Sequence, residues 1–344
     1  MKPNAIYRSV VILLVMIFSI SGCKTHPEEI TFSRTSFVLG TVVDVNLFDH
    51  GSDELLDTME ARLQEIENTM SVNVPSSEVN LINDNAGIKS VQVSDDTYNV
   101  IKKSIEYSVL SHGAFDVTFG PIVNLWQIGT DQAAVPDDQS LAEALALVDY
   151  NNIELLDDNY VYLTEQDMRI DLGGIAKGFA ADEIIEIAKK AGVESALVNL
   201  GGNVKTLGLK VDGKPFNVGI QNPFDMRNAY LGIVSVSDQT VVTSGDYERY
   251  FTEDGVRYHH IFDYRTGYPV VNGLGSVTLI SSEAIDADAL STALYVLGAD
   301  EGTRLIETLD GIECLYVTYD NEIYVSSGLK SNFTITDRTF SVVN

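Results

Sequence analysis

The octapeptide Asp-Leu-Gly-Gly-Ile-Ala-Lys-Gly, residues 171–178, carries the strongest chemical signal in this chain of 344 residues. It follows the strand-like stretch Val161 to Ile170 and opens a helix-like stretch from Gly174 to Ala191. We expect unpaired backbone N–H groups and the positive end of a helix dipole at this junction, and both favour an anion. Lys177 adds a cation and Asp171 a hydrogen-bond acceptor, a combination that suits a nucleotide with a pyrophosphate. The spacing matches neither a Walker A loop nor the dinucleotide fingerprint, so a glycine-rich turn with a surface lysine is the alternative.

A second group of candidate residues is the run Asp286 to Thr292 in a predicted helix. Asp288 and Thr292 are four residues apart, so both side chains project from one face of that helix. A carboxylate and a hydroxyl are hard oxygen ligands of the kind that magnesium accepts, with phosphate oxygens and waters completing its shell. Because this face also carries apolar residues next to the core, a carboxylate there requires a cation. The pattern predicts a magnesium site, and an acid-enriched helix N-terminus is the alternative.

A third segment, His259 to Pro269, combines two histidines with Arg265 in a turn after a predicted strand. An arginine fork suits a carboxylate or a phosphate. A histidine near a metal-bound phosphate can take a proton from an attacking hydroxyl. The alternative is a strand histidine with a satisfied hydrogen bond, next to an internal pair between Arg265 and Asp263.

Aromatic residues in and after the segment Gly113 to Pro121 could contact a planar ring. Phe115 and Trp126 could shape a slot for a flavin or an adenine, and Asp116 could accept a hydrogen bond from a ring N–H. Core aromatics and a turn aspartate explain the same residues equally well.

Helices and strands alternate along the chain without a regular strand–helix–strand order. Apolar periodicity and capping residues predict helices, and short alternating runs predict strands. The predicted helices are Leu55 to Met70, Tyr98 to Val109 after the cap Ser94, Gln139 to Val148, Gly174 to Ala191, Ala284 to Leu297 and Asp300 to Leu309. The predicted strands include Leu231 to Val236, Ser276 to Ile280, Cys314 to Tyr319 and Ile323 to Ser326, with a turn between strands at Asn199 to Asn203. This arrangement indicates an α+β domain with largely antiparallel sheets.

The formal net charge of −28 makes nucleic acid a poor partner. The same charge repels a free dinucleotide, so a bound divalent cation and local basic groups would have to overcome it. Cys314 lies in a strand-like run and is expected to be a buried, unpaired thiol.

The first residues of the chain read as a targeting segment. A basic start precedes the apolar run Val10 to Ile20, which is too short to span a membrane, and small residues then precede Cys23, as in a bacterial lipoprotein processing site. We expect residues 1–22 to be a lipoprotein signal peptide, Cys23 to carry lipid, and residues 23–30 to be a tether to a domain over 31–344. The alternative is an ordinary cleaved signal with an incidental cysteine.

Taken in order, these segments resemble the FAD:protein FMN transferase family, the ApbE-like flavin transferases. Any single piece is weak, but the ordered set is specific and spans about residues 37–298. The matching pieces are Leu39-Gly40-Thr41, Ser77-Glu78 with Asn83, Gly113 to Pro121 with Trp126, Asp171 to Asp182, Asn199 to Asn203, Thr243 to Arg249, His260 to Pro269 and Asp286 to Thr292.

The resemblance implies a single catalytic domain of the ApbE-like, T-fold-related α+β type and a phosphoryl-transfer reaction. In that reaction FMN passes from FAD to a threonine hydroxyl of an acceptor protein, with magnesium or manganese bound and AMP released. The acceptors would be flavin-carrying subunits of membrane redox pumps, at the outer (periplasmic or extracytoplasmic) face of the bacterial cytoplasmic membrane. By position, the metal ligands are Asp288, Thr292 and the Gly174 carbonyl, the catalytic residues are His260, Asp288 and Lys177, and the flavin-nucleotide contacts are Leu39, Asn73, Ala114, Phe115, Asp116, Asp171, Lys177 and Phe262.

Three residues depart from the family's pattern. Leu39 replaces a methionine, a volume-conserving change, and Tyr264 replaces a proline. Asn73 stands where many members have an aromatic residue, and its smaller polar wall could admit a second metal ion and water. Hydrolysis of FAD to FMN and AMP, alone or as a second activity, is therefore an alternative to transfer. A lipoprotein that binds flavin without turning it over is a third.

Overall fold

A nine-stranded sheet forms the centre of the computed structural model, which describes residues 31–226 and 229–343. Neighbouring strands run antiparallel except for the last pair, β15 and β17. In spatial order the strands are β1 (Phe32–Val38), β2 (Thr41–Leu47), β6 (Ala196–Leu200), β7 (Asn203–Leu207), β10 (Thr240–Gly245), β13 (Leu274–Ser281), β14 (Glu313–Thr318), β15 (Glu322–Val325) and β17 (Ser341–Val342).

Three smaller antiparallel sheets surround this one. They consist of β8 (Phe216–Gln221), β9 (Tyr230–Val236) and β16 (Phe333–Ile335); of β3 (Val91–Gln92), β4 (Ile153–Leu156) and β5 (Tyr160–Leu163); and of β11 (Tyr250–Glu253) with β12 (Val256–His259). The helices are α2 (Asp53–Met70), α3 (Glu78–Asp84), α4 (Asp95–Leu110), α5 (Gly120–Trp126), α6 (Asp138–Leu145), α7 (Ala176–Lys190) and α8 (Ala284–Ile306), with short 3₁₀ turns η1 (Val117–Phe119), η2 (Tyr150–Asn152) and η3 (Asp157–Asn159).

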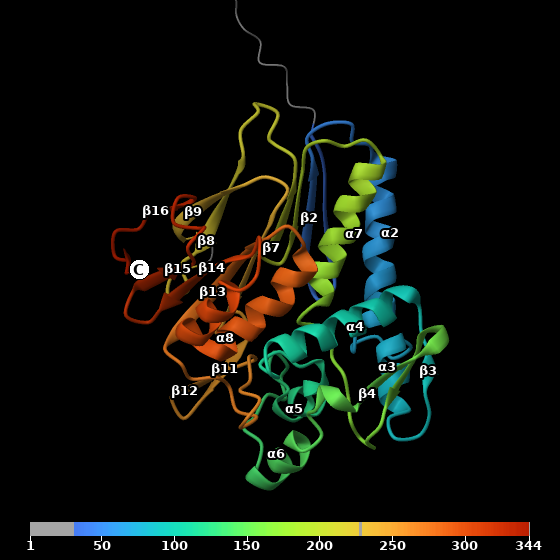
Figure 1. Cartoon of the computed structure of the whole chain (residues 1–344). Coiled ribbons are helices and arrows are strands. Elements are labelled where there is room, and N and C mark those ends of the chain that lie inside the picture. The colour runs from blue at the N-terminus through green and yellow to red at the C-terminus, as the bar shows by residue number, and fades with distance from the viewer. Residues whose placement is uncertain (1–30, 227–228, 344) are drawn as a thin grey trace, which may run out of the picture. The chain divides into compact units, whose positions relative to one another are not determined.

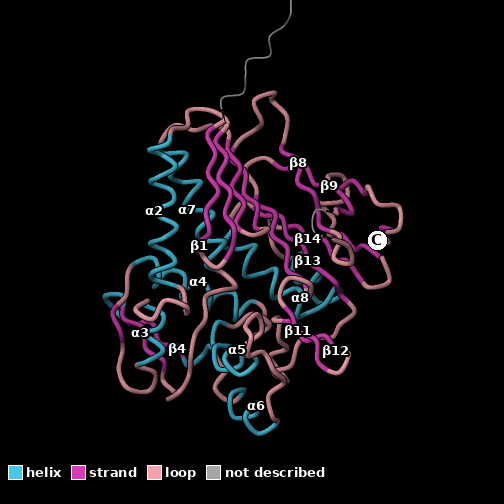
Figure 2. The backbone as a smooth tube through the Cα atoms, turned by 180° about the vertical axis from the view of Figure 1, so that it is seen from behind, coloured by secondary structure: helices cyan, strands magenta, loops and turns pink. Residues whose placement is uncertain are grey.

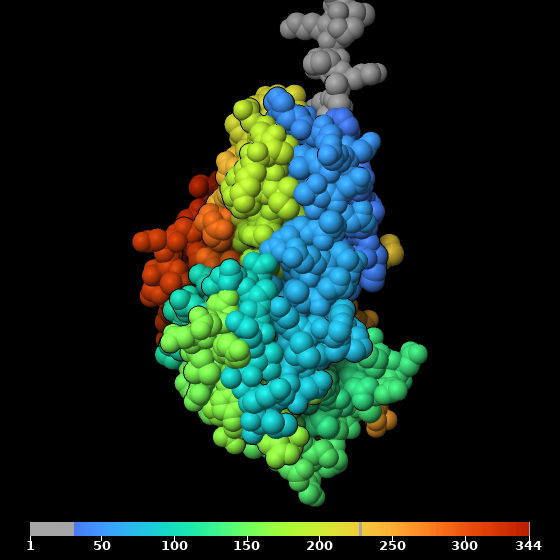
Figure 3. All heavy atoms as spheres, turned by 90° about the vertical axis from the view of Figure 1, so that its right-hand side faces the viewer, coloured from blue at the N-terminus to red at the C-terminus, as the bar shows by residue number. Residues whose placement is uncertain are grey.

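Apolar side chains cover the central sheet on both faces. All eight residues of β13 are buried, and successive side chains of a strand point to opposite faces. Val277 and Leu279 join a core with α2, α7 and α8, whereas Ile280 joins a second core with β8 and β9. Figure 1 shows α2 and α7 side by side, with α8 beside them, and Figure 2 shows the strands from behind. In the space-filling view of Figure 3, α2 in blue and α7 in yellow-green share one surface.

The predicted α+β class with largely antiparallel sheets is confirmed. The structure joins the two predicted C-terminal helices into α8, which is interrupted at Gly298, where φ is 81°. The predicted turn after β6 is a tight β6–β7 connection. Cys314 is a buried free thiol, as expected.

The strand predicted over Val161 to Ile170 was wrong beyond Leu163. From residue 164 to the start of α7 the chain forms turns and loop, although Met168 and Ile170 are fully buried. The side chain of Asn83 replaces a neighbouring strand there, because its amide donates to the Ile170 carbonyl at 2.9 Å and accepts from the Ile170 N–H at 2.7 Å. An apolar loop whose backbone is hydrogen-bonded by a side chain has the same sequence pattern as a buried strand.

Among residues 31–226 and 229–343, no helix has the length and apolar character needed to cross a bilayer. The predicted signal peptide, the tether and Cys23 lie outside the described residues.

Candidate functional site

The N-termini of α7 and α8 meet and are capped by each other's side chains. Neither helix has a capping side chain at its own N-cap position. The Asp288 carboxylate, one turn into α8, accepts the Gly178 N–H of α7 at 2.9 Å. The Asp182 carboxylate of α7 accepts the N–H groups of Ala284 and Ile285, both at 2.9 Å. Two carboxylates thus satisfy helix-start donors that would otherwise lack partners.

Gly178 allows the two helices to approach this closely. A Cβ atom at this position would lie 2.2 Å from the carbonyl oxygen of Ala284, a distance that no side chain tolerates. Every residue larger than glycine would force the helices apart and would lengthen the bond between Gly178 and Asp288.

Asp288 is 4% exposed, and both of its carboxylate oxygens have partners. Besides the Gly178 N–H, it accepts the Asn203 side-chain amide at 2.8 Å and lies 3.5 Å from the Lys177 ammonium. Lys177 also donates to the Gly173 carbonyl at 3.1 Å. The buried carboxylate is therefore stabilised by one cation and two neutral donors, and it lies beside the glycine-rich turn, as predicted.

The oxygens that the resemblance implies for a metal lie close to one another. A Cβ atom on Gly174 would be 3.9 Å from the Thr292 hydroxyl and 3.2 Å from the Phe115 ring, so these three residues are neighbours. In the described part of the chain, no backbone N–H donates to the Gly174 carbonyl, which leaves its lone pairs available. The donors are one carboxylate, one hydroxyl and one carbonyl, a set that fits magnesium completed by phosphate and water oxygens.

The described residues contain no cluster of three or more His, Cys, Asp or Glu that could hold a metal ion. A site of the zinc type, made of several nitrogen or sulfur ligands, is thus not found in them.

His260 is held with one ring nitrogen free. Its Nδ1 lies 3.2 Å from the Arg249 carbonyl, which also accepts the His260 backbone N–H at 3.2 Å. Because a carbonyl only accepts, Nδ1 carries the proton and Nε2 keeps its lone pair. Burial, and after it the charge of the Arg249 cation, lowers the pKa of His260 to about 4. At neutral pH the ring is therefore uncharged and able to accept a proton at Nε2.

His259 has a structural role instead. It is buried, its Nε2 donates to the Val270 carbonyl at 2.9 Å, and its Nδ1 accepts the Ile261 N–H at 3.3 Å. Burial lowers its pKa as well. Of the two adjacent histidines, only His260 has a ring nitrogen left for chemistry.

Asp171 connects the glycine-rich turn to the segment before α5. Its N–H donates to the Val117 carbonyl at 2.8 Å, and its carboxylate accepts the Gly173 N–H at 2.8 Å. Burial raises the pKa of Asp171, while the Gly173 N–H and the cations Arg249 and Lys177 act in the opposite direction. The same two cations lower the pKa of His260, which places all four charged or titratable groups in one region.

Asp116 caps the 3₁₀ turn η1, as a turn aspartate does. One carboxylate oxygen accepts from the Thr118 N–H at 2.8 Å and hydroxyl at 2.6 Å, and the other accepts the Tyr150 N–H at 3.1 Å. Burial raises the pKa of Asp116 to about 6. Ala114 and Phe115 precede it and are buried, with the Phe115 ring against Gly174.

Of the two interpretations of Trp126, the structure has the core aromatic and not the wall of a ring-binding slot. Trp126 has no exposed surface, and its indole N–H donates to the Gly267 carbonyl at 2.9 Å. It packs with Phe262 at a ring separation of 5.9 Å in an aromatic core. The Phe262 side chain is thus engaged, but within the described residues neither its N–H nor its carbonyl has a backbone partner. A ligand contact at Phe262 would use the main chain.

Arg265 is also engaged internally. Its guanidinium makes two bonds to the Asp263 carboxylate, at 2.9 and 2.8 Å. Of the two interpretations of Arg265, the structure therefore has the internal pair with Asp263, and the guanidinium is not free to bind a phosphate.

Leu39 lies at the tip of the β1–β2 hairpin, in the left-handed region with a φ of 55°. A residue with a branched side chain rarely adopts this conformation, and such strain is common at functional sites. A Cβ on the next residue, Gly40, would be 4.0 Å from the Arg249 guanidinium, so this tip adjoins the region of His260.

Asn73 is exposed on the loop between α2 and α3. Its N–H donates to the Ser71 hydroxyl at 3.2 Å. Asn80 holds this loop by donating to the carbonyls of Val72 and Val74, both at 2.9 Å. No described contact joins Asn73 to the other candidate residues, so its place at the nucleotide stays a prediction.

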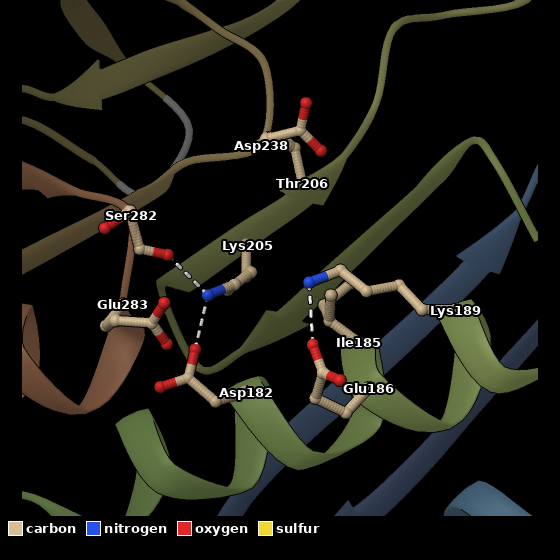
Figure 4. Close-up of a pocket in the computed structure, with 9 residues that line it drawn as sticks. All are labelled: Asp182, Ile185, Glu186, Lys189, Lys205, Thr206, Asp238, Ser282 and Glu283. Carbon is tan, nitrogen blue, oxygen red and sulfur yellow. Dashed lines mark hydrogen bonds and ion pairs between the residues drawn. The ribbon is translucent and has the colours of Figure 1, made fainter.

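A separate cavity of about 220 Å³ lies behind the Asp182 cap (Figure 4). Its two lysines are already engaged, because Lys205 bonds to Asp182 and to the Ser282 carbonyl, and Lys189 bonds to Glu186. It therefore offers no free cation for a phosphate and is not the candidate site.

Sequence reasoning missed the groups that reach the site from a distance. Asn203 was recognised only as a turn residue within one matching segment, and Asp182 only as the end of another. Their partners are 85 and at least 102 residues away in the sequence. For Asn203 the local sequence signal was a polar residue at the end of a glycine turn, and this signal is too common to identify a site.

Known proteins similar to this chain share one family. The family model described as "ApbE family" matches residues 39–316. An FAD:protein FMN transferase of Treponema pallidum (strain Nichols) is 34% identical, with 99% of each chain covered, and one of Klebsiella pneumoniae (strain 342) is 36% identical, covering 91% of this chain and 97% of the relative.

Solved structures give the same result. The ApbE protein of Thermotoga maritima has a TM-score of 0.82 at 33% identity, covering 88% of this chain and 99% of that one. The flavin transferase ApbE of Vibrio cholerae has a TM-score of 0.79 at 30% identity, with the same coverage. The resemblance inferred from the ordered motifs is thereby confirmed, and the chain belongs to the ApbE family.

Proposed function

We propose that the chain is an FAD:protein FMN transferase that moves FMN from FAD to a threonine hydroxyl of an acceptor protein and releases AMP. The observation that carries the proposal is the buried Asp288 carboxylate, set beside Lys177 and an α7 start that lacks its own cap. Its neighbourhood, with Thr292 and a Gly174 carbonyl lacking a backbone donor, supports the binding of a metal-complexed pyrophosphate. The names of the relatives support the same activity.

Asp288, Thr292 and the Gly174 carbonyl would hold magnesium, or manganese in its place. The ion would supply positive charge to the pyrophosphate oxygens. This charge would stabilise the negative charge that develops when the FMN phosphorus separates from the bridging oxygen. Lys177, which now approaches Asp288 at 3.5 Å, would turn its ammonium toward the phosphates once that carboxylate binds the ion.

His260 would act as the general base. The acceptor hydroxyl gives its proton to Nε2, its oxygen forms a bond to the FMN phosphorus, and the bond to the AMP oxygen breaks. The Arg249 carbonyl supports this role because it keeps the other ring nitrogen protonated. Phe115, next to Gly174, would pack against the flavin nucleotide and exclude water from the reacting phosphate.

The test is intact-mass analysis of an acceptor fragment with an exposed threonine, incubated with FAD, magnesium and the protein. We expect the acceptor to gain one FMN through a phosphoester while AMP appears in equal amount. An acceptor of unchanged mass, with or without metal, contradicts transfer. Tight FAD binding without any turnover would instead favour the flavin-binding protein.

Hydrolysis of FAD is the second candidate, and the exposed, polar Asn73 favours it. The measurement is AMP release in the absence of any acceptor. We expect Asn73→Tyr to slow this release while transfer to the acceptor continues. Unchanged release in the variant would show that this position does not control water access.

We further propose that the chain is anchored by lipid on Cys23 at the outer face of the cytoplasmic membrane, close to a membrane redox subunit as acceptor. The basic start, short apolar run and cysteine of the first residues support this location. Mass analysis of the N-terminal peptide tests it, since Cys23→Ala should remove the lipid and release the protein from the membrane. A wild-type peptide that carries no lipid contradicts the anchor.

A further inference from the structure

The side chain of Arg249 is a cation at the candidate site to which no ligand has been assigned. Its Cδ would lie 3.9 Å from a Cβ on Gly129, and its Nη2 would lie 4.0 Å from a Cβ on Gly40. The guanidinium therefore extends between the Gly129 loop and the β1–β2 hairpin tip. Its charge acts on both His260 and Asp171, so it lies near the proposed base and the glycine-rich turn.

Several other arginines of this acidic chain are paired with carboxylates. Arg34 contacts Asp57 and Glu60, Arg62 contacts Glu65, Asp96 and Glu183, and Arg265 contacts Asp263. For Arg249 the described residues show neither an ion pair nor a side-chain hydrogen bond, and the side chain is exposed. Arg169 and Arg304 also have only neutral partners among the described residues, so what distinguishes Arg249 is its place beside His260 and the hairpin tip.

The two parts of Arg249 have different roles. Its carbonyl orients His260, and this contact does not depend on the side chain. Its guanidinium has five donors in a planar fork that matches two oxygens of a phosphate. Negative charge on the phosphates of a transferring group is stabilised most by donors fixed in position before the reaction.

We propose that the Arg249 guanidinium binds oxygens of the pyrophosphate bridge of FAD and is a further catalytic residue of this enzyme. The inference rests on the proposed function and deepens it. Arg249 donates to the bridge when FAD binds, and it neutralises the charge that passes to the AMP oxygen when the bond to the FMN phosphorus breaks.

The experiment compares the full chain with Arg249→Ala, Arg249→Lys and the control Arg304→Ala, a surface arginine of α8 whose Nε donates to the Asp300 carbonyl. Binding of FAD and of riboflavin is followed by flavin fluorescence without metal, so the readout does not depend on turnover. We expect Arg249→Ala to weaken FAD binding about 10-fold to 100-fold, because a bond to a charged group contributes roughly 1.5–3 kcal/mol. Riboflavin, which has no phosphate, should bind all variants equally.

Turnover supplies a second readout. We expect a fall in kcat of about 10²-fold or more in Arg249→Ala, partial recovery in Arg249→Lys, and no change in Arg304→Ala. In Arg249→Ala the pKa of His260 should rise, because the Arg249 cation no longer lowers it. The acid limb of the rate profile should therefore shift from about pH 4 to a higher pH.

Two results of the binding measurement would overturn the inference. Equal FAD affinity in Arg249→Ala and wild type would show that the fork does not reach the phosphates. Equal weakening of FAD and riboflavin would show a structural role. A wild-type protein that binds no FAD would instead contradict the proposed function itself, whereas normal transfer by Arg249→Ala contradicts only the role of the arginine.

Discussion

Replacing Asp288 separates the structural role of this carboxylate from its chemical role. In Asp288→Ala, the Gly178 N–H and the Asn203 amide lose their acceptor, which now lies 2.9 and 2.8 Å away. An unsatisfied buried donor costs roughly 1–3 kcal/mol, so the loss of the acceptor of two donors should lower the free energy of unfolding by about 2–6 kcal/mol. Losing a negative charge at the α7 N-terminus adds up to about 1 kcal/mol.

Asp288→Asn is the matched control. The amide oxygen can still accept the Gly178 N–H, and a flip of Asn203 would restore its bond to residue 288. We therefore expect this variant to lose only about 1–2 kcal/mol of stability, chiefly through the missing charge. Both variants lack the carboxylate, so both should lose AMP release to the same extent.

Urea unfolding and single-turnover AMP release measure the two effects independently. We expect the two variants to lose activity equally and stability unequally. Wild-type turnover in Asp288→Asn would refute the role of the charge. Equal stability of the two variants would refute the idea that Asp288 caps α7.

Two further predictions concern the neighbours of this carboxylate. Gly178→Ala should lower the free energy of unfolding by about 1–3 kcal/mol, because the new Cβ would lie 2.2 Å from the Ala284 carbonyl oxygen. This clash should outweigh the helix preference of alanine, which is worth up to about 1 kcal/mol. A gain of stability in urea unfolding would contradict the close helix contact. For His260, kcat/KM should rise with pH through about 4 as the ring becomes neutral, and His260→Asn should lose this limb and about 10²–10⁴ in rate. Because its folded pKa lies below the unfolded value near 6.5, the wild type should also lose stability relative to His260→Asn as pH falls from about 6.5 to 4; a difference that is constant over this window would contradict the burial of the neutral ring.

The elements of this fold were predictable where local pattern decides them. Apolar periodicity after the predicted cap Ser94 corresponds to α4, and the Ser94 hydroxyl accepts a backbone N–H at the helix start. The periodicity from Leu55 to Met70 corresponds to α2. The strand predicted through Ile170 failed because Asn83, distant in sequence, supplies the hydrogen bonds that a neighbouring strand would otherwise supply.

The site was predictable in part for the same reason. Spacing alone put Asp288 and Thr292 on one helix face, and the structure has the carboxylate buried there. The Asn203 amide that holds Asp288, and the Arg249 carbonyl that fixes the His260 tautomer, come from other strands and loops. Which of the two histidines keeps a free nitrogen depends on those long-range contacts, so the sequence pattern could not decide it.

The most direct test of the account is a crystal of the protein soaked with FAD and manganese, examined by anomalous scattering. We predict one manganese peak with oxygen ligands from Asp288, Thr292 and the Gly174 carbonyl, bridging to the pyrophosphate of a bound FAD. A structure in which FAD binds while this corner holds no metal, or in which the metal binds elsewhere, would contradict it.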